Sequence, residues 1–98
     1  MRKNIVIVNY PGCESRTFVH QSDASYEAIL EEIFAAFNHG SGCESELFLK
    51  SKMRSLSVND CVCVNSHWYQ CRSVGWVEVT PEYVDQLEKA VEIGRAHV

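Results

Sequence analysis

The 98-residue sequence lacks the features that mark membrane or secreted proteins. No apolar run approaches the roughly 20 residues of a membrane-spanning helix. The short run Ile5–Val8 is followed directly by the polar Asn9, whereas a secretory signal needs a longer apolar stretch and a small-residue cleavage site. We therefore expect a cytoplasmic protein with no membrane partner.

An excess of positive charge is also missing. The chain has 9 lysines and arginines against 13 acidic residues, which gives a net charge of −4. Nonspecific duplex binding relies on neutralising phosphates, so this balance opposes it, and the long like-charge blocks of a DNA mimic do not occur either. Apolar residues at 46% and charged residues at 22% are typical of a soluble globular domain. With no repeat or low-complexity tract, residues 1–98 are predicted to form one domain.

The five cysteines include no Cys-x-x-Cys pair. A zinc site would have to combine Cys61, Cys63, His67 and Cys71. Cys61 and Cys63 share one strand face, however, and a two-residue hairpin puts His67 and Cys71 on the other. Structural zinc is usually held by separated Cys-x₂₋₄-Cys pairs. We therefore predict no metal and no cofactor, and we expect most of the thiols to be small buried hydrophobes.

The clearest periodic signal is a helix over residues 24–37. Six large apolar side chains recur at i, i+3, i+4, i+7, i+8 and i+11, which places them on one stripe. They are Tyr26, Ile29, Leu30, Ile33, Phe34 and Phe37. Ser22 and Asp23 are candidate N-caps, and Asn38-His39-Gly40 ends the helix. Burying each apolar side chain is worth about 1.5–3 kcal/mol, so this helix needs a sheet to cover.

Strand signals surround this helix. The predicted strands are Ile5–Asn9, Arg16–His20, Cys61–Val64, His67–Ser73 and Trp76–Val79. The first two are expected to pair antiparallel. Asn65-Ser66 closes a hairpin between the third and the fourth. In that register Val62 and Tyr69 face one side of the sheet, and Trp68 and Gln70 face the other.

The remaining segments complete an α+β fold. Thr80-Pro81-Glu82 starts a C-terminal helix that Gly94 ends. Residues 46–53 are either a helical turn or a short strand, with Leu47, Phe48 and Leu49 partly buried. We predict a mostly antiparallel sheet of about five short strands, with a central amphipathic helix on one face. The C-terminal helix is expected at an edge or on that same face. A small, partly closed barrel is the alternative.

Three segments resemble the YodL-like domain, a small family of uncharacterised function that is often found in proteins of phages, plasmids and other mobile elements. The matching segments are Ile33-Phe34-x-x-Phe37-Asn38, then Arg54-Ser55-Leu56-Ser57-Val58-x-Asp60, and Tyr69-x-Cys71-x-Ser73-x-Gly75-Trp76-x-Glu78-Val79. The resemblance covers residues ~26–79, and its motif is moderately specific. It implies a mobile-element context and brings no catalytic residue.

Five motif residues are best explained by structural roles. Ser55 and Ser57 lack the Gly-x-Ser-x-Gly elbow of a nucleophile, so we expect their hydroxyls to bond nearby backbone groups. Asp60 lacks an acidic partner at an informative spacing and is expected to cap a turn. Gly75 and Trp76 mark the turn into the last strand.

Three functions remain open at this stage. The first is a non-enzymatic interaction or accessory protein that presents Trp68 and Gln70 to an unknown protein partner, or to a second copy in a homodimer. The second is a single-stranded nucleic-acid binder, in which Trp68 lies beside four cations. These cations are Lys50, Lys52, Arg54 and Arg72.

The third candidate is a small enzyme with a thiolate–imidazole pair. Cys63 or Cys71 would act with His67 or His20. Nothing in the spacing of these residues brings them together. We therefore expect a protein that is not an enzyme, and we rank nucleic-acid binding above catalysis.

Overall fold

The computed structural model describes residues 1–13 and 15–96, with the backbone alone for residues 92–96. Within them the chain forms an antiparallel sheet of five strands with three helices. The strands are β1 (Lys3–Asn9), β2 (Arg16–Gln21), β3 (Cys61–Val64), β4 (His67–Cys71) and β5 (Trp76–Val79). The helices are α1 (Tyr26–Ala36), α2 (Glu46–Ser51) and α3 (Pro81–Ala96).

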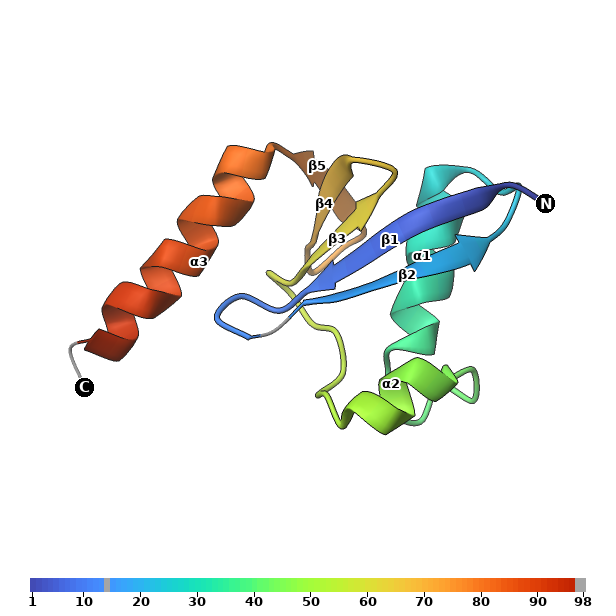
Figure 1. Ribbon diagram of the computed structural model, residues 1–98, viewed down its shortest axis with the longest axis horizontal. Helices are drawn as coiled ribbons and strands as arrows, with labels where there is room; N and C mark the ends of the chain where they lie inside the picture. Colours follow the sequence, from blue (N-terminus) through green and yellow to red (C-terminus); the bar gives the residue numbers. More distant parts are fainter. Residues whose placement is uncertain (14, 97–98) are drawn as a thin grey trace.

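The strand order is β2-β1-β3-β4-β5, and every neighbouring pair is antiparallel (Figure 1). The predicted α+β class is therefore confirmed, and the sheet is open rather than a barrel. No helix in the described part of the chain combines the length and apolarity that crossing a bilayer requires.

Helix α1 begins at Tyr26, two residues later than predicted. Its N-cap is Ser25, whose hydroxyl accepts the Ala28 N–H at 3.2 Å. Ser22 and Asp23, the residues that we expected to cap it, lie before the helix, and the Asp23 carboxylate instead accepts the Arg2 N–H at 2.6 Å. Several polar residues in a row could cap this helix, so sequence alone did not distinguish among them.

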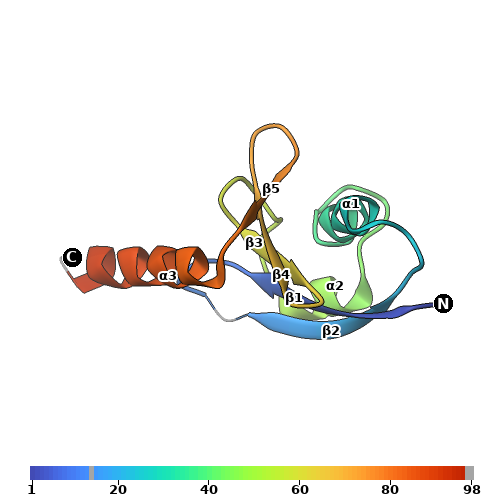
Figure 2. The same ribbon diagram turned by 90° about the horizontal axis from the view of Figure 1, so that it is seen from above.

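The core lies between α1 and one face of the sheet (Figure 2). The buried cluster is Val6, Val8, Tyr10, Ile29, Leu30, Ile33, Phe37, Phe48, Leu56, Val62 and Val64. The predicted stripe of α1 accounts for four of these, while Tyr26 and Phe34 are half-buried at its margin. Residues 46–51 form a helix, which buries Phe48. Leu49 is 53% exposed, so its predicted burial is wrong, because consecutive helical residues point about 100° apart.

The turn between β3 and β4 has the predicted two-residue form. Asn65 and Ser66 have φ values of +48° and +75°, as a type I′ turn requires. The Asn65 side chain also accepts a hydrogen bond from the Ile5 N–H at 2.8 Å. It donates to the Asn4 side-chain oxygen at 2.9 Å and to the Tyr26 hydroxyl at 3.1 Å. This turn is therefore tied to β1 and α1 as well as closing the hairpin.

Helix α3 meets the sheet on the face opposite α1. The Tyr83 hydroxyl donates to the Gln70 side-chain oxygen at 3.3 Å, and the Glu88 carboxylate accepts the Gly12 N–H at 2.9 Å. Beyond these contacts the helix projects past the sheet (Figures 1 and 2). Our predicted placement at an edge or on the α1 face is wrong, and the helix continues past Gly94 to its last described residue.

Candidate binding groove

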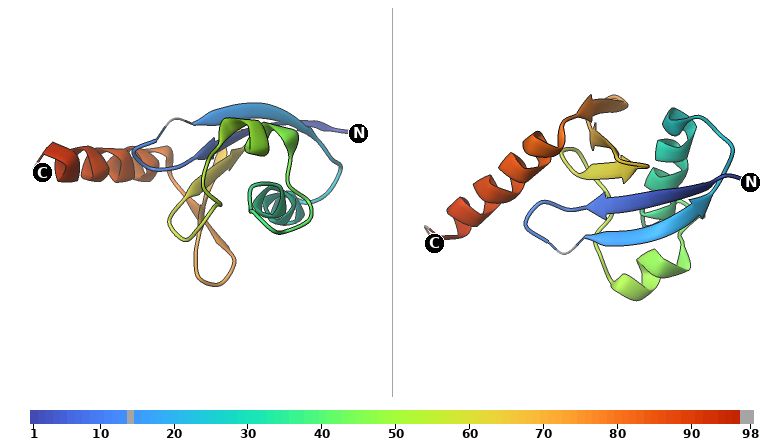
Figure 3. Two further views of the ribbon diagram at one scale, coloured as in Figure 1. Left: turned by 90° about the horizontal axis from the view of Figure 1, so that it is seen from below. Right: turned by 45° about the horizontal axis from the view of Figure 1, so that its top comes forward.

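A groove runs between α1 and the β4–β5 hairpin. In Figures 2 and 3, β5 and the loop before it stand beside α1 as a separate wall. Three hollows of about 510, 440 and 190 Å³ lie between these elements, and Trp76 lines all three. They are therefore one continuous depression. We call it the α1–β5 groove, defined by Glu27 and Glu31 of α1 and by Tyr69, Trp76 and Glu78 of the hairpin.

The β4–β5 turn places Trp76 in the groove. The Arg72 N–H donates to the Gly75 carbonyl at 3.0 Å, and Gly75 has a φ of +69°, which glycine adopts at little cost. After this turn the chain returns along β4, and the Trp76 ring meets Phe34 of α1 edge-on, with ring centroids 6.3 Å apart. Trp76 is half-buried, so part of its surface stays open to the groove.

Carboxylates line both walls of the groove. Glu27 and Glu31 are four residues apart and exposed on the same side of α1. Glu78 comes from β5 on the opposite wall, with 63% of its side chain exposed. Among the described residues that line these hollows, Arg72 is the only one with a permanent positive charge, and it lines the smallest. The groove therefore has an excess of negative charge.

The electrostatics of Tyr69 agree with this distribution. Burial raises the pKa of the Tyr69 hydroxyl, and the negative charges of Glu78 and Glu27 raise it further. A His67 ring nitrogen lies 3.5 Å from the Glu78 carboxylate. Tyr69 and Trp76 thus give the groove an aromatic surface that is flanked by carboxylates.

Such a surface suits an alkylammonium or guanidinium group on an apolar stem. A cation over an aromatic ring gains about 0.5–1 kcal/mol at an exposed site, and an exposed ion pair adds about 0.2–1 kcal/mol. Each contact is weak by itself. Binding in this groove would therefore depend on several such contacts made together.

The predicted interaction residues Trp68 and Gln70 lie on the sheet face opposite α1. Gln70 is only 1% exposed and bonds α3 through Tyr83, so its side chain helps to attach α3 and is not presented at the surface. Trp68 is half-buried. On its face of the sheet Ile5 and Val77 are 58% and 44% exposed.

The four predicted cations do not form one patch. Lys50 pairs with a glutamate of its own helix at 2.9 Å. Lys52 and Arg54 line a separate hollow of about 310 Å³ together with Arg16, which sequence reasoning had not included. Arg72 lines the groove instead. Single-stranded nucleic acid would need these charges along a shared track.

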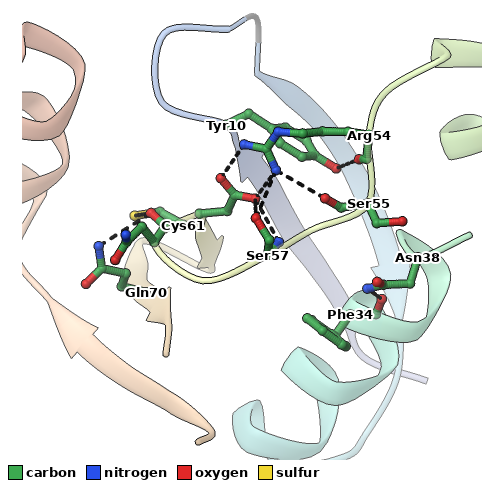
Figure 4. A network of polar contacts seen from close by, with 10 residues as sticks. Tyr10, Phe34, Asn38, Arg54, Ser55, Ser57, Cys61 and Gln70 are labelled. Carbon is green, nitrogen blue, oxygen red and sulfur yellow. Dashed lines mark hydrogen bonds and ion pairs between the residues drawn. The ribbon is translucent and has the colours of Figure 1, made fainter. Parts of the chain in front are cut away.

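Arg54 belongs to a network of polar contacts near the end of β1 (Figure 4). The Asp60 carboxylate accepts hydrogen bonds from both terminal nitrogens of Arg54, at 2.6 and 2.8 Å, and from the Ser57 N–H at 2.9 Å. The guanidinium also lies 4.7 Å from the Tyr10 ring centre, and the Tyr10 hydroxyl donates to the Arg54 carbonyl. Burial, reinforced by the Asp60 charge, raises the pKa of Tyr10 to about 12.

The same segment explains the two motif serines. The Ser55 hydroxyl accepts a backbone N–H from the loop after α1 at 2.9 Å. The Ser57 hydroxyl contacts Arg54 and Asp60. Both hydroxyls therefore fix the path of the chain into β3.

The cysteines and histidines form no catalytic arrangement in the described residues. Cys61, Cys63 and Cys71 are buried, and burial raises the pKa of each thiol, that of Cys61 to about 11. A raised pKa disfavours the thiolate that a nucleophile needs. His20 and His67 contact glutamates. Among the side chains that the structure describes, in residues 1–13 and 15–91, no three metal-ligating groups lie together.

Comparison with known proteins found no matching family model and no similar curated protein or solved structure. The resemblance to the YodL-like domain thus stays a prediction. Sequence reasoning had missed the acidic lining of the groove. The i,i+4 pair Glu27 and Glu31 was visible in the sequence, but only the tertiary fold brings Glu78 and Trp76 opposite it.

Proposed function

We propose that this protein is a non-enzymatic interaction protein that binds a cationic segment of a partner protein in the α1–β5 groove. The observation that carries this proposal is the set of three carboxylates, Glu27, Glu31 and Glu78, around the rings of Tyr69 and Trp76. Lysine and arginine side chains combine the charge and the apolar stem that such a surface receives.

The shape of the groove favours a polypeptide over a small molecule. Small-molecule sites typically enclose 70–90% or more of the ligand surface. Here the hollows are open to solvent and follow one another along α1. An extended chain segment can occupy such a depression along its whole length.

The charge of the protein also guides the choice of partner. With a net charge of −4, a second copy is a poor occupant of an acidic groove. Nucleic acid is a poorer one, because its phosphates would be repelled. A basic protein segment is the complementary partner.

The proposed accessory role follows from the resemblance to the YodL-like domain. That family is often found in proteins of phages, plasmids and other mobile elements, which is the context in which we place this role. Neighbouring phage or conjugation genes would support this role, and a metabolic operon would count against it.

The proposal is tested with short peptides that contain several lysines or arginines, measured by fluorescence anisotropy at low and high salt. The variant replaces Glu27, Glu31 and Glu78 with Gln. If each carboxylate contributes about 0.5 kcal/mol, the triple change weakens binding about tenfold. Binding to the unchanged protein should also weaken as salt rises.

A matched control carries the same change in net charge at exposed positions outside the groove. It is Glu46→Gln with Glu82→Gln and Asp85→Asn. We expect this control to bind within about twofold of the unchanged protein, because none of its altered side chains lines the groove and exposed charges that make no direct contact contribute little. Equal losses in both variants, or no binding of any cationic peptide, would refute the proposal.

A further inference from the structure

We infer that the cationic segment binds as an additional β-strand on the outer edge of β5. This inference rests on the proposed function and adds a binding mode and a sequence pattern for the partner. The partner's main chain would pair with β5, while every second side chain enters the α1–β5 groove.

Strand β5 has an available edge. It is the last strand in the order β2-β1-β3-β4-β5, and no further strand pairs with it in the described residues. An unpaired edge presents main-chain donors and acceptors that another extended segment can satisfy.

The alternation of hydrogen-bonded and non-bonded pairs between β4 and β5 identifies which main-chain groups of β5 face outward. Arg72 and Gly75 are joined by a main-chain bond of 3.0 Å. Hydrogen-bonded and non-bonded pairs alternate in an antiparallel ladder. In the observed register, Cys71 opposite Trp76 is then a non-bonded pair, as is Tyr69 opposite Glu78. The N–H and C=O groups of Trp76 and Glu78 therefore point away from β4.

These two residues also supply side chains to the groove. A strand paired with β5 would thus run along the groove, with its same-face side chains about 4.5–5.5 Å from those of Trp76 and Glu78, measured between Cβ atoms. A lysine or arginine there meets Glu78 on one side and Glu27 or Glu31 on the other.

The alternate side chains of the partner would lie on the opposite sheet face. There the neighbouring side chain of β5 is Val77, which is 44% exposed. An apolar residue at these positions covers it. The partner pattern is therefore cationic, apolar, cationic, read at successive residues.

The other edge of the sheet offers no such combination. The Ser22 N–H donates to the Arg2 carbonyl at 2.9 Å, so in β2 the outward main-chain groups belong to Thr17, Val19 and Gln21. Their side chains lie on the face opposite α1. The free main chain of β2 is therefore not aligned with a charged groove, which favours β5.

The test uses the unchanged protein and a peptide of alternating lysine and valine, followed by amide hydrogen exchange in NMR spectra. Before binding, the Val77 amide should be protected by β4, while those of Trp76 and Glu78 exchange quickly. On binding, exchange at Trp76 and Glu78 should slow at least tenfold, with Val77 little changed.

N-methylation of the peptide provides a second measurement. Methyl groups at alternate backbone nitrogens should weaken binding at least tenfold, and methyl groups at the intervening nitrogens should have little effect. A helical or irregular bound segment would not give this two-residue period.

The outcomes separate the two proposals. If the peptide binds and the glutamine variant weakens it, yet Trp76 and Glu78 exchange as before, strand addition is overturned and the proposed function stands. Equal binding of free spermine also overturns strand addition. If no cationic peptide binds, both proposals fail.

Discussion

Replacement of Arg54 by Ala should destabilise the fold strongly although more than half of its side chain is exposed. The Asp60 side chain is 3% exposed and the Arg54 side chain 53%. Removal of Arg54 leaves a buried carboxylate with the Ser57 N–H as its remaining strong donor. Losing one partner of a fully buried pair costs about 3–5 kcal/mol. Because water can reach the vacated space, we expect about 2–3 kcal/mol here.

Urea denaturation followed by tryptophan fluorescence measures this loss in the free energy of unfolding. The loss corresponds to a fall in Tm of about 10–20 °C for a domain of this size. Arg54→Lys keeps the charge without the two-pronged geometry and should cost about 1 kcal/mol. Arg72→Ala is the exposed control, expected within about 0.5 kcal/mol of the unchanged protein. A loss below about 0.5 kcal/mol for Arg54→Ala, or strict additivity with Asp60→Asn, would refute the reasoning.

Three further outcomes concern the turn, the thiols and alkaline pH. Ser66→Gly should raise stability by up to about 1 kcal/mol in urea titrations, because it relieves the positive φ of an exposed residue; a loss would contradict the type I′ turn. Iodoacetamide should label Cys13 and Cys43 quickly and the other three cysteines only on unfolding; more than two fast thiols by mass spectrometry would contradict their burial. Folding raises the pKa of Tyr10 from 10.0 to about 12 and that of Cys61 from 9.0 to about 11. The unfolded chain therefore loses these protons at lower pH than the folded chain, so the free energy of unfolding should be full below pH ~9 and fall as pH rises toward ~12. A constant free energy of unfolding across that range would contradict the raised values.

Local patterns in the sequence were sufficient to predict most of the fold. The stripe on α1 follows from helical periodicity, and the Asn65-Ser66 turn follows from the tolerance of asparagine for positive φ. The faces of β3 and β4 then follow from alternation along each strand. These features depend on residues close in sequence.

Features that depend on distant contacts could not be predicted. Gln70 was a candidate surface residue, but it bonds to Tyr83 of α3 and is only 1% exposed. The hydrogen bonds that attach α3, from Tyr83 to Gln70 and from Gly12 to Glu88, join residues of separate elements and leave no local pattern in the sequence. The groove arises because the β4–β5 hairpin stands apart from α1. The carboxylates of Glu27 and Glu78, on different elements and far apart in sequence, had no reason to be considered together.

The two tryptophans allow the most direct test of the groove as the binding site. Trp76 lies in the groove and Trp68 on the opposite face of the sheet, so an NMR titration with the alternating lysine–valine peptide can follow both indole N–H signals. Binding in the groove predicts that the Trp76 signal shifts and the Trp68 signal stays in place. A shift of the Trp68 signal with Trp76 unchanged would contradict the groove and locate the interaction on the opposite face.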